Sequence, residues 1–302
     1  MFPILVQTIQ RDSSISFPGL GNLFLDPPSY FTVFGRNIYF YGVLIAIGFI
    51  SALLFCSHVS SRFGIKGDDF TDMMLWLIPL SILGARCYYV LFRLDEYLQQ
   101  PSKIIAVWEG GLAIYGGIIA GVLTALVFCR RRKIPPTAML DLAIMGLMPG
   151  QILGRWGNFL NREAFGAETE IFCRMGLTAP DGTTIFVHPT FLYESLWNLI
   201  GFLVLLILLY RGLRRYDGQF TLLYYFWYGL GRSWIEGLRT DSLYIPGTGI
   251  RVSQALSLAL VVITLVLLLI QSRRPHPPEA LYVNRAAAAP HAEDGQDETT
   301  TN

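Results

Sequence analysis

Long apolar segments recur along this 302-residue chain, and they constrain its fold more than any other feature. A helix needs about 20 mostly apolar residues to cross the hydrocarbon core of a bilayer. That core offers the backbone no hydrogen-bond partners, so such segments cross it as helices. The segments lie at residues 38–56, 73–92, 112–129, 138–153, 191–210, 219–237 and 252–270. The sequence therefore predicts an all-α integral membrane protein with about seven transmembrane helices. The fourth is expected to be kinked or broken at Pro149 and Gly150.

The composition excludes several other classes of protein. Hydrophobic residues make up 53% of the chain and charged residues 15%, whereas soluble domains have about 25% charged residues. The net charge of +1 lacks the basic excess of a nucleic-acid-binding domain. His58 and His188 have no sequence partner at metal-ligand spacing. We therefore expect no nucleic-acid partner, no metal site and no cofactor.

The distribution of basic residues predicts the orientation of the chain. Two short connections on the same side carry basic clusters, at 130–133 and 211–215. Such clusters mark the cytoplasmic side, so the amino terminus is expected outside and the carboxyl terminus in the cytoplasm. Residues 1–37 then form an external segment and residues 38–271 the membrane domain. Residues 272–302 form a cytoplasmic tail, which is too polar to fold alone and is expected to be disordered.

The longest external connection, at about 154–190, is expected to form a small cap. Within it, two stretches at 171–177 and 183–187 flank the turn signal Pro180-Asp181-Gly182. Two such stretches joined by a proline- and glycine-containing turn are typical of a β-hairpin. The cap is therefore predicted to contain one.

Charged and polar side chains gather at the external ends of the predicted spans. On the sixth span, Tyr228, Arg232 and Glu236 recur every fourth residue and share one helix face with Arg239. The charged members of the cluster are Arg86, Arg155, Glu194, Arg232, Glu236 and Arg239. Since the arginines outnumber the glutamates, we expect unpaired guanidinium donors that suit an anionic ligand, and a lipid phosphate is the natural candidate.

Plainer interpretations of the same residues stay open. Arg232 and Glu236 have the spacing of a structural ion pair on a helix, and tyrosines such as Tyr41 and Tyr115 are common in the aromatic belt at a membrane interface. Glycines spaced by four, as at Gly117 and Gly121, more often serve close helix packing than chemistry. The glycine doublets around Tyr115 also allow the backbone to bend closely around a ligand.

Several motifs resemble those of bacterial prolipoprotein diacylglyceryl transferases. The most specific is Gly154-Arg155-Trp156-Gly157-Asn158-Phe159-Leu160-Asn161, followed by Glu163 and Gly166. The others are Tyr41-Gly42, Gly84-Ala85-Arg86, residues 108–117, His188-Pro189-Thr190, Tyr193-Glu194, and residues 228–232 with Glu236 and Arg239. The matches keep the family's order from the first span to the sixth, so the resemblance covers most of the chain.

The resemblance implies an enzyme of the bacterial plasma membrane whose active site faces the outer leaflet. Such an enzyme moves the diacylglyceryl group of phosphatidylglycerol onto the thiol of the lipobox cysteine in a prolipoprotein, so that a thioether forms and glycerol phosphate leaves. The family pattern assigns Arg155 and Arg232 to the phosphate and headgroup, and Asn158 and Glu163 to positioning. Its further substrate-site positions match Tyr41, Arg86, Gly166, His188, Tyr228, Glu236 and Arg239.

Tyr115 departs from the family pattern, because some members carry a histidine in its glycine-flanked motif. A tyrosine, with an ordinary pKa of about 10, is a poor base for a thiol. Tyr115 is therefore expected to position substrate, or to act as the base if nearby arginines depress its pKa; otherwise another group or water takes the proton. A transporter for an anionic solute and a non-catalytic phospholipid-binding protein are the competing hypotheses.

Two mutational expectations follow from the sequence. Arg232→Ala should abolish transfer with little loss of folding. Cys173→Ser should leave activity intact, because the nucleophilic thiol belongs to the substrate.

Overall fold

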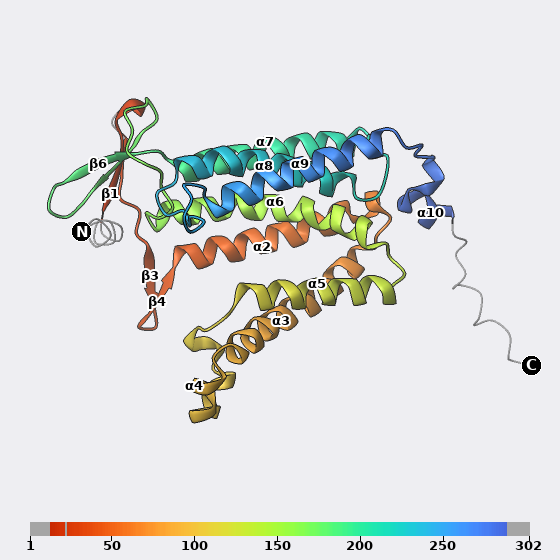
Figure 1. The fold of residues 1–302 in the computed structure, drawn as a ribbon, viewed down its shortest axis with the longest axis horizontal. Coiled ribbons are helices and arrows are strands. Elements are labelled where there is room, and N and C mark those ends of the chain that lie inside the picture. The colour runs from red at the N-terminus through yellow and green to blue at the C-terminus, as the bar shows by residue number, and fades with distance from the viewer. Residues whose placement is uncertain (1–12, 22, 289–302) are drawn as a thin grey trace, which may run out of the picture. The chain divides into compact units, whose positions relative to one another are not determined.

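The computed structural model describes residues 13–21 and 23–288, which are mostly helical (Figure 1). Each predicted span is a long helix. These helices are α2 (Phe40–Val59), α3 (Gly67–Leu91), α5 (Ile114–Arg131), α6 (Pro136–Leu160), α7 (Thr190–Tyr210), α8 (Gln219–Ile235) and α9 (Val252–Ser272). All but α8 are long and apolar enough to cross a membrane. The chain is therefore a multi-pass membrane protein. Helix α8 falls short because it has 17 residues and carries Arg232 in its last turn.

Helix α6 continues through Pro149, so the helix is not broken there, and a kink at this proline stays a prediction. The helix ends at Leu160, beyond the predicted limit of 153. The first seven residues of the Gly154–Asn161 motif are therefore helical, which places Arg155 and Asn158 within one turn of each other.

The chain forms two compact units. Unit 1 comprises the chain up to Leu54, Ile144–Arg214 and Gln219–Pro275, and unit 2 comprises Phe55–Ala143, Arg215–Gly218 and the chain from His276 onward. Helices α2 and α6 contribute to both units.

A four-stranded antiparallel sheet caps unit 1 beside the first turn of α7 (Figure 1). The predicted hairpin is confirmed as β5 (Met175–Thr178) and β6 (Thr184–Val187). The amino-terminal segment adds two strands to this hairpin, β1 (Ser14–Phe17) and β2 (Leu23–Leu25), which the sequence did not indicate. The strand order in the sheet is β2-β1-β5-β6. The buried apolar residues beneath it are Ile15, Phe17, Phe159, Phe165, Met175, Leu177, Val187 and Phe191. A second hairpin, β3 (Tyr30–Val33) and β4 (Arg36–Tyr39), leads directly into α2.

A tryptophan pair, Trp197 and Trp227, joins α7 to α8. The two rings stack with centroids 4.3 Å apart, and each indole N–H donates to the other residue's backbone carbonyl, at 2.9 and 2.8 Å. Each ring lies against a glycine of the other helix. A Cβ at Gly201 would lie 2.5 Å from the Trp227 ring, and a Cβ at Gly231 would lie 2.3 Å from that of Trp197. The pair thus fixes how the two helices that carry Glu194 and Arg232 face each other.

Unit 2 is built on α3 and α5, which pack so closely that a Cβ at Gly116 would lie 2.3 Å from the carbonyl oxygen of Gly84. Beyond α3 come the short helix α4 (Leu94–Gln99) and two 3₁₀ turns, Pro101–Ile105 and Val107–Glu109. The remaining 3₁₀ turns are Pro18–Leu20, Ser60–Phe63, Glu236–Leu238 and Pro278–Ala280.

The first part of the predicted tail has regular structure. Helix α10 (Tyr282–Ala288) is held in unit 2 because the Tyr282 N–H donates to the Asp217 carboxylate at 3.1 Å. Arg285 lies 3.5 Å from the same carboxylate. The tail therefore differs from the expected disorder up to residue 288, and its remainder lies outside the described residues.

Candidate active site

Glu194, in the first two turns of α7, is the centre of an ion-pair cluster in unit 1. Its side chain is only 6% exposed, and its carboxylate contacts three guanidinium groups. The distances are 2.5 Å from Oε2 to Arg155 Nη2, 3.3 Å from Oε1 to Arg232 Nη1 and 3.6 Å from Oε1 to Arg239 Nη1. The arginines come from α6, from α8 and from the residue just after the 3₁₀ turn that follows α8. One buried carboxylate therefore brings together three of the arginines that the sequence predicted at the external ends of the spans.

Two more carboxylates complete the cluster. Arg232 Nη2 lies 2.5 Å from Glu236 Oε2, which is on a side chain only 2% exposed. Arg239 donates two hydrogen bonds to Asp241, at 2.9 and 2.7 Å, and these bonds lower the pKa of the Asp241 carboxyl group. Three carboxylates thus face three guanidiniums. The expected surplus of arginines is wrong for this cluster, because the sequence count overlooked Asp241.

The cluster nevertheless presents a cationic wall. A cavity of about 330 Å³ is lined by Arg155, Tyr228, Arg232, Arg239, Ser253, Leu256, Ser257 and Leu260. None of these described lining residues is acidic, since Glu194 and Glu236 are buried behind the guanidinium groups. Guanidinium groups in a partly buried site form strong, directed hydrogen bonds to phosphate. The cavity therefore combines a phosphate-binding wall with the apolar side chains Leu256 and Leu260 of α9.

Asn158 and Glu163 continue the polar network from Arg155. Arg155 Nη1 donates to Asn158 Oδ1 at 3.3 Å, and Asn158 Nδ2 donates to Glu163 Oε1 at 2.9 Å. Asn161 Nδ2 also donates to Glu163 Oε1, at 3.3 Å. Asn158 thus holds one guanidinium nitrogen of Arg155 and Glu194 the other, which supports the positioning role expected for Asn158 and Glu163.

Gly166 and Tyr41 supply close packing around these groups. Gly166 pairs with Arg239 in an isolated β-bridge, and a Cβ there would lie 2.9 Å from the Leu238 carbonyl oxygen. The Tyr41 ring lies against Gly157, where a Cβ would be 2.5 Å from the ring. Both glycines are therefore needed for close approach. Tyr41 thereby packs on the turn of α6 between Arg155 and Asn158.

His188 lies in the cap, where its Nδ1 is 3.3 Å from the hydroxyl of Tyr193. Cys173 Sγ is 3.6 Å from the same hydroxyl. Burial lowers the pKa of His188, so its ring is neutral at pH 7. His188 thus contacts the residue that precedes Glu194 in the chain.

Arg86 and Tyr115 belong to unit 2. The buried Arg86 guanidinium donates to the carbonyls of Lys103, Ile104, Gly110 and Gly111 at 2.5–2.9 Å. Gly110 and Gly111 have positive φ angles of 87° and 70°, and a Cβ at Gly111 would lie 2.5 Å from Arg86 Nη1. The glycine doublet therefore bends around this arginine. These contacts give Arg86 a role in positioning the 103–111 segment.

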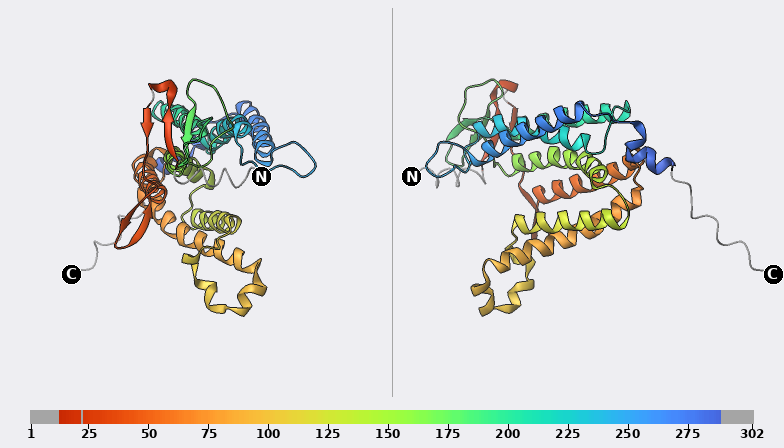
Figure 2. Two further views of the ribbon diagram at one scale, coloured as in Figure 1. Left: turned by 90° about the vertical axis from the view of Figure 1, so that its left-hand side faces the viewer. Right: turned by 45° about the vertical axis from the view of Figure 1, so that its right-hand side comes forward.

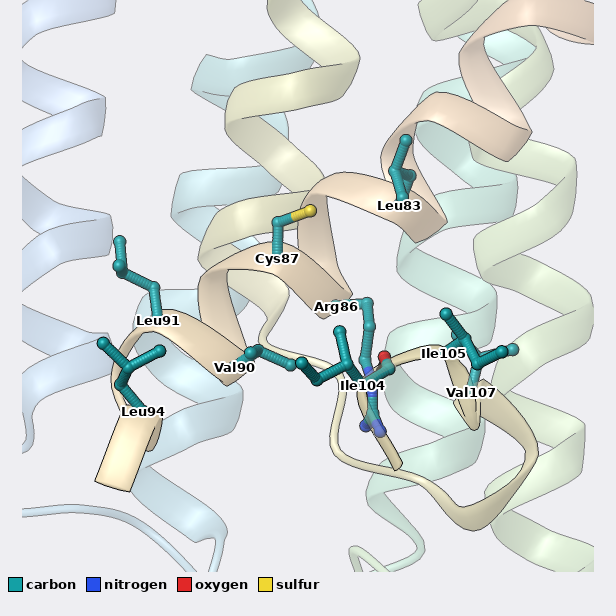
Figure 3. Close-up of a pocket in the computed structure, with 9 residues that line it drawn as sticks. All are labelled: Leu83, Arg86, Cys87, Val90, Leu91, Leu94, Ile104, Ile105 and Val107. Carbon is teal, nitrogen blue, oxygen red and sulfur yellow. Dashed lines mark hydrogen bonds between the residues drawn. The ribbon is translucent and has the colours of Figure 1, made fainter. Parts of the chain in front are cut away.

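A second cavity, of about 380 Å³, lies beside Arg86 (Figure 3). Apart from Arg86 its lining is apolar or sulfur-bearing, with Leu83, Cys87, Val90, Leu91 and Leu94 on one side and Ile104, Ile105 and Val107 on the other. Tyr115 lies in the first turn of α5, and its side chain is 68% exposed. It is thus accessible to a ligand at the surface of unit 2.

Sequence reasoning missed Arg162. The Arg162 side chain is buried, and its backbone has a positive φ of 51°. Its guanidinium donates to the carbonyls of Ser13 and Leu160 at 2.9 and 2.7 Å. It also pairs with Asp26 at 3.1 Å. Arg162 therefore anchors the amino-terminal segment to the end of α6. The available signal was its place directly after the asparagine-containing motif.

Comparison with known proteins covers most of the chain. The sequence model of the family described as prolipoprotein diacylglyceryl transferase matches residues 28–270. The phosphatidylglycerol–prolipoprotein diacylglyceryl transferase of Lactobacillus acidophilus is 44% identical over 248 residues, which cover 80% of this chain and 88% of that protein. Proteins of the same name from Lactobacillus delbrueckii subsp. bulgaricus and Limosilactobacillus reuteri are 44% and 43% identical, over 80% of this chain and 89% and 90% of their own lengths.

Proposed function

Because the chain belongs to the prolipoprotein diacylglyceryl transferase family, we propose that it transfers the diacylglyceryl group of phosphatidylglycerol to the lipobox cysteine of prolipoproteins. The chain is a transferase of lipoprotein biosynthesis, and it carries out the first step of lipoprotein maturation. The products are a thioether-linked lipid on the protein and free glycerol phosphate.

The observation that carries this proposal is the cavity lined by Arg155, Arg232 and Arg239. The reaction requires a site that holds a lipid phosphate and stabilises the charge that develops as it leaves. Guanidinium groups fixed before the reaction meet this requirement without reorganising at the moment of bond breaking. Glu194 supports that role because it contacts all three guanidinium groups.

The chemical step is a displacement at the carbon of the diacylglyceryl group that is bonded to the phosphate oxygen. The substrate thiolate attacks this carbon, the new C–S bond forms, and the C–O bond to the phosphate breaks. The bonding electron pair leaves with the phosphate oxygen, where Arg155 and Arg232 stabilise the added negative charge. Tyr228 lines the cavity and Tyr41 packs against Gly157 beside Arg155. Arg239 and Glu236 hold the surrounding network. Gly166 and His188 shape the boundary of the site in the cap. Arg86 holds the segment at 103–111.

The thiol proton must leave before or during the attack, since a free thiol has a pKa of about 8.5 and is mostly protonated at neutral pH. We assign Tyr115 a positioning role. The base is then either another group or water, and the enzyme's own cysteines are not needed.

The proposed location is the bacterial plasma membrane, with the site at the outer leaflet, the amino terminus outside and the carboxyl terminus in the cytoplasm. An exported precursor presents its lipobox cysteine at that face. The basic clusters at 130–133 and 211–215 support this orientation.

The test follows labelled diacylglyceryl transfer from phosphatidylglycerol to a lipobox peptide by the purified protein, together with glycerol phosphate release. We expect equimolar transfer and release by the wild type. Arg155→Lys should lose activity, because an ammonium group cannot reproduce the two-sided contacts of a guanidinium. Arg93→Lys is the matched control, since Arg93 is an arginine of unit 2 whose side chain is 57% exposed. Binding of lipid without release by the folded wild type would refute the proposal.

A further inference from the structure

The connection between α8 and α9, here called the apolar loop (residues 241–251), exposes apolar side chains outside the long helices. Figure 2 shows it extending from the ends of the two helices. Leu243 is 76% exposed, and Tyr244 and Ile250 are each 51% exposed. A run of exposed apolar side chains on a structured segment marks an interaction surface.

The loop is a folded hairpin. The N–H of Val252 donates to the Leu243 carbonyl and the N–H of Ile245 donates to the Ile250 carbonyl, both at 2.9 Å. Tyr244 and Arg251 form a β-bridge between these bonds. The turn at 246–249 has the sequence Pro-Gly-Thr-Gly. The apolar side chains are therefore held at the base of the hairpin, and its tip is small and polar.

Both ends of the loop are joined to the arginine cavity. At one end, Asp241 accepts two hydrogen bonds from Arg239, which lines the cavity. At the other, Arg251 Nη1 donates to the Gly237 carbonyl at 2.7 Å and Nη2 donates to the Arg239 carbonyl at 3.3 Å. Arg251 also lies over the Tyr244 ring, 5.6 Å from its centroid. The exposed apolar surface is thus continuous with the residues that hold Arg239.

We infer that the apolar loop is the docking surface for the apolar signal segment of the protein substrate. The inference rests on the proposed function, which requires a cysteine thiol to reach the cavity while the rest of its peptide extends outside it. The loop joins α8 and α9, the helices that supply Tyr228, Arg232 and Ser253 to the cavity. A signal peptide carries an apolar run of about 7 to 15 residues. Such a run has the apolar chemistry needed to pack against the exposed side chains at the base of the loop.

The position of the apolar side chains favours a peptide over the bilayer surface as the occupant. A segment that inserts into the membrane interface would present its apolar side chains at its tip. Here they lie within three residues of Asp241 or Arg251, next to the cavity where the thiol has to arrive.

The test compares the wild type with a Leu243→Ser/Ile250→Ser variant, which leaves the Tyr244–Arg251 contact in place, using a long lipobox peptide with its apolar segment and a short peptide that lacks it. We expect the variant to raise the Kd and KM of the long peptide about tenfold, since burying two apolar side chains contributes at least this factor. The KM of phosphatidylglycerol and the Kd of the short peptide should not change. Leu98→Ser, at a leucine of unit 2 that is 66% exposed, is the control and should behave as the wild type.

Each outcome decides the inference. An unchanged Kd for the long peptide would overturn it, as would a variant that raises only the KM of phosphatidylglycerol, because the loop would then contact lipid. The Kd is measured with a fluorescent peptide in the absence of transfer. A wild type that binds the long peptide more tightly than the variant does, but transfers nothing, would therefore refute the proposed function and leave the docking surface supported.

Discussion

Replacing Arg232 by alanine should both abolish transfer and destabilise the protein. The Arg232 side chain is 16% exposed and forms ion pairs with two carboxylates, on Glu194 and Glu236. Glu194 keeps Arg155 and Arg239 as partners in the variant. Glu236 is 2% exposed and loses its 2.5 Å ion pair. The structure therefore argues against the sequence-based expectation of little effect on folding.

The size of the effect follows from this burial. Removing one partner of a buried ion pair destabilises a protein by about 3–5 kcal/mol, which is a large part of a total stability of about 5–15 kcal/mol. At roughly 2–4 °C per kcal/mol, Arg232→Ala should lower the midpoint of thermal unfolding by on the order of 10 °C. The unfolding midpoint of Arg232→Lys should lie between those of the wild type and Arg232→Ala, because an ammonium group keeps the charge but not the fork-shaped set of donors.

A double-mutant cycle separates the two roles of this arginine. Adding Glu236→Gln to Arg232→Ala removes the unpaired buried charge, so the double variant should recover about 2 kcal/mol, within the range of coupling measured for contacting residues. Both variants should remain inactive, since the cavity has lost one of its guanidiniums. The assay is thermal unfolding in detergent with transfer measured on the same samples. Strictly additive destabilisation in the double variant would refute the reasoning.

Three further predictions follow from single contacts. The pKa of Asp241 lies below its ordinary value of 3.8 because Arg239 donates hydrogen bonds to it; its stabilisation is fully present above that value and is lost as pH falls through the lowered pKa. Asp241→Asn should therefore unfold with a smaller acid dependence than the wild type in a pH series of melting curves. Cys173→Ser should retain transfer, as a folded but inactive variant would implicate an enzyme thiol. Gly201→Ala should be destabilised by about 1–3 kcal/mol through overpacking against the tryptophan pair, whereas Gly42→Ala meets nothing within 4 Å and should melt as the wild type does.

The sequence by itself determined the helices and four of the eight residues that line the cavity. Apolar runs near the thickness of a bilayer have one favourable backbone conformation, so the seven helices could be predicted, with errors at their ends. Helical spacing placed Tyr228, Arg232 and Arg239 together, and the structure finds all three lining one cavity with Arg155. The orientation in the membrane and the chemical role of each residue remain predictions.

Only the tertiary structure decided how the charges are paired. Arg86 is bound by carbonyls of a loop that follows it in the chain, Asp241 balances Arg239, and β1 joins a sheet with strands about 160 residues away in the sequence. Periodicity reports which face of an element is apolar. It does not report which distant segment approaches that face, because the partner of a buried charge is chosen by packing and desolvation across the whole fold.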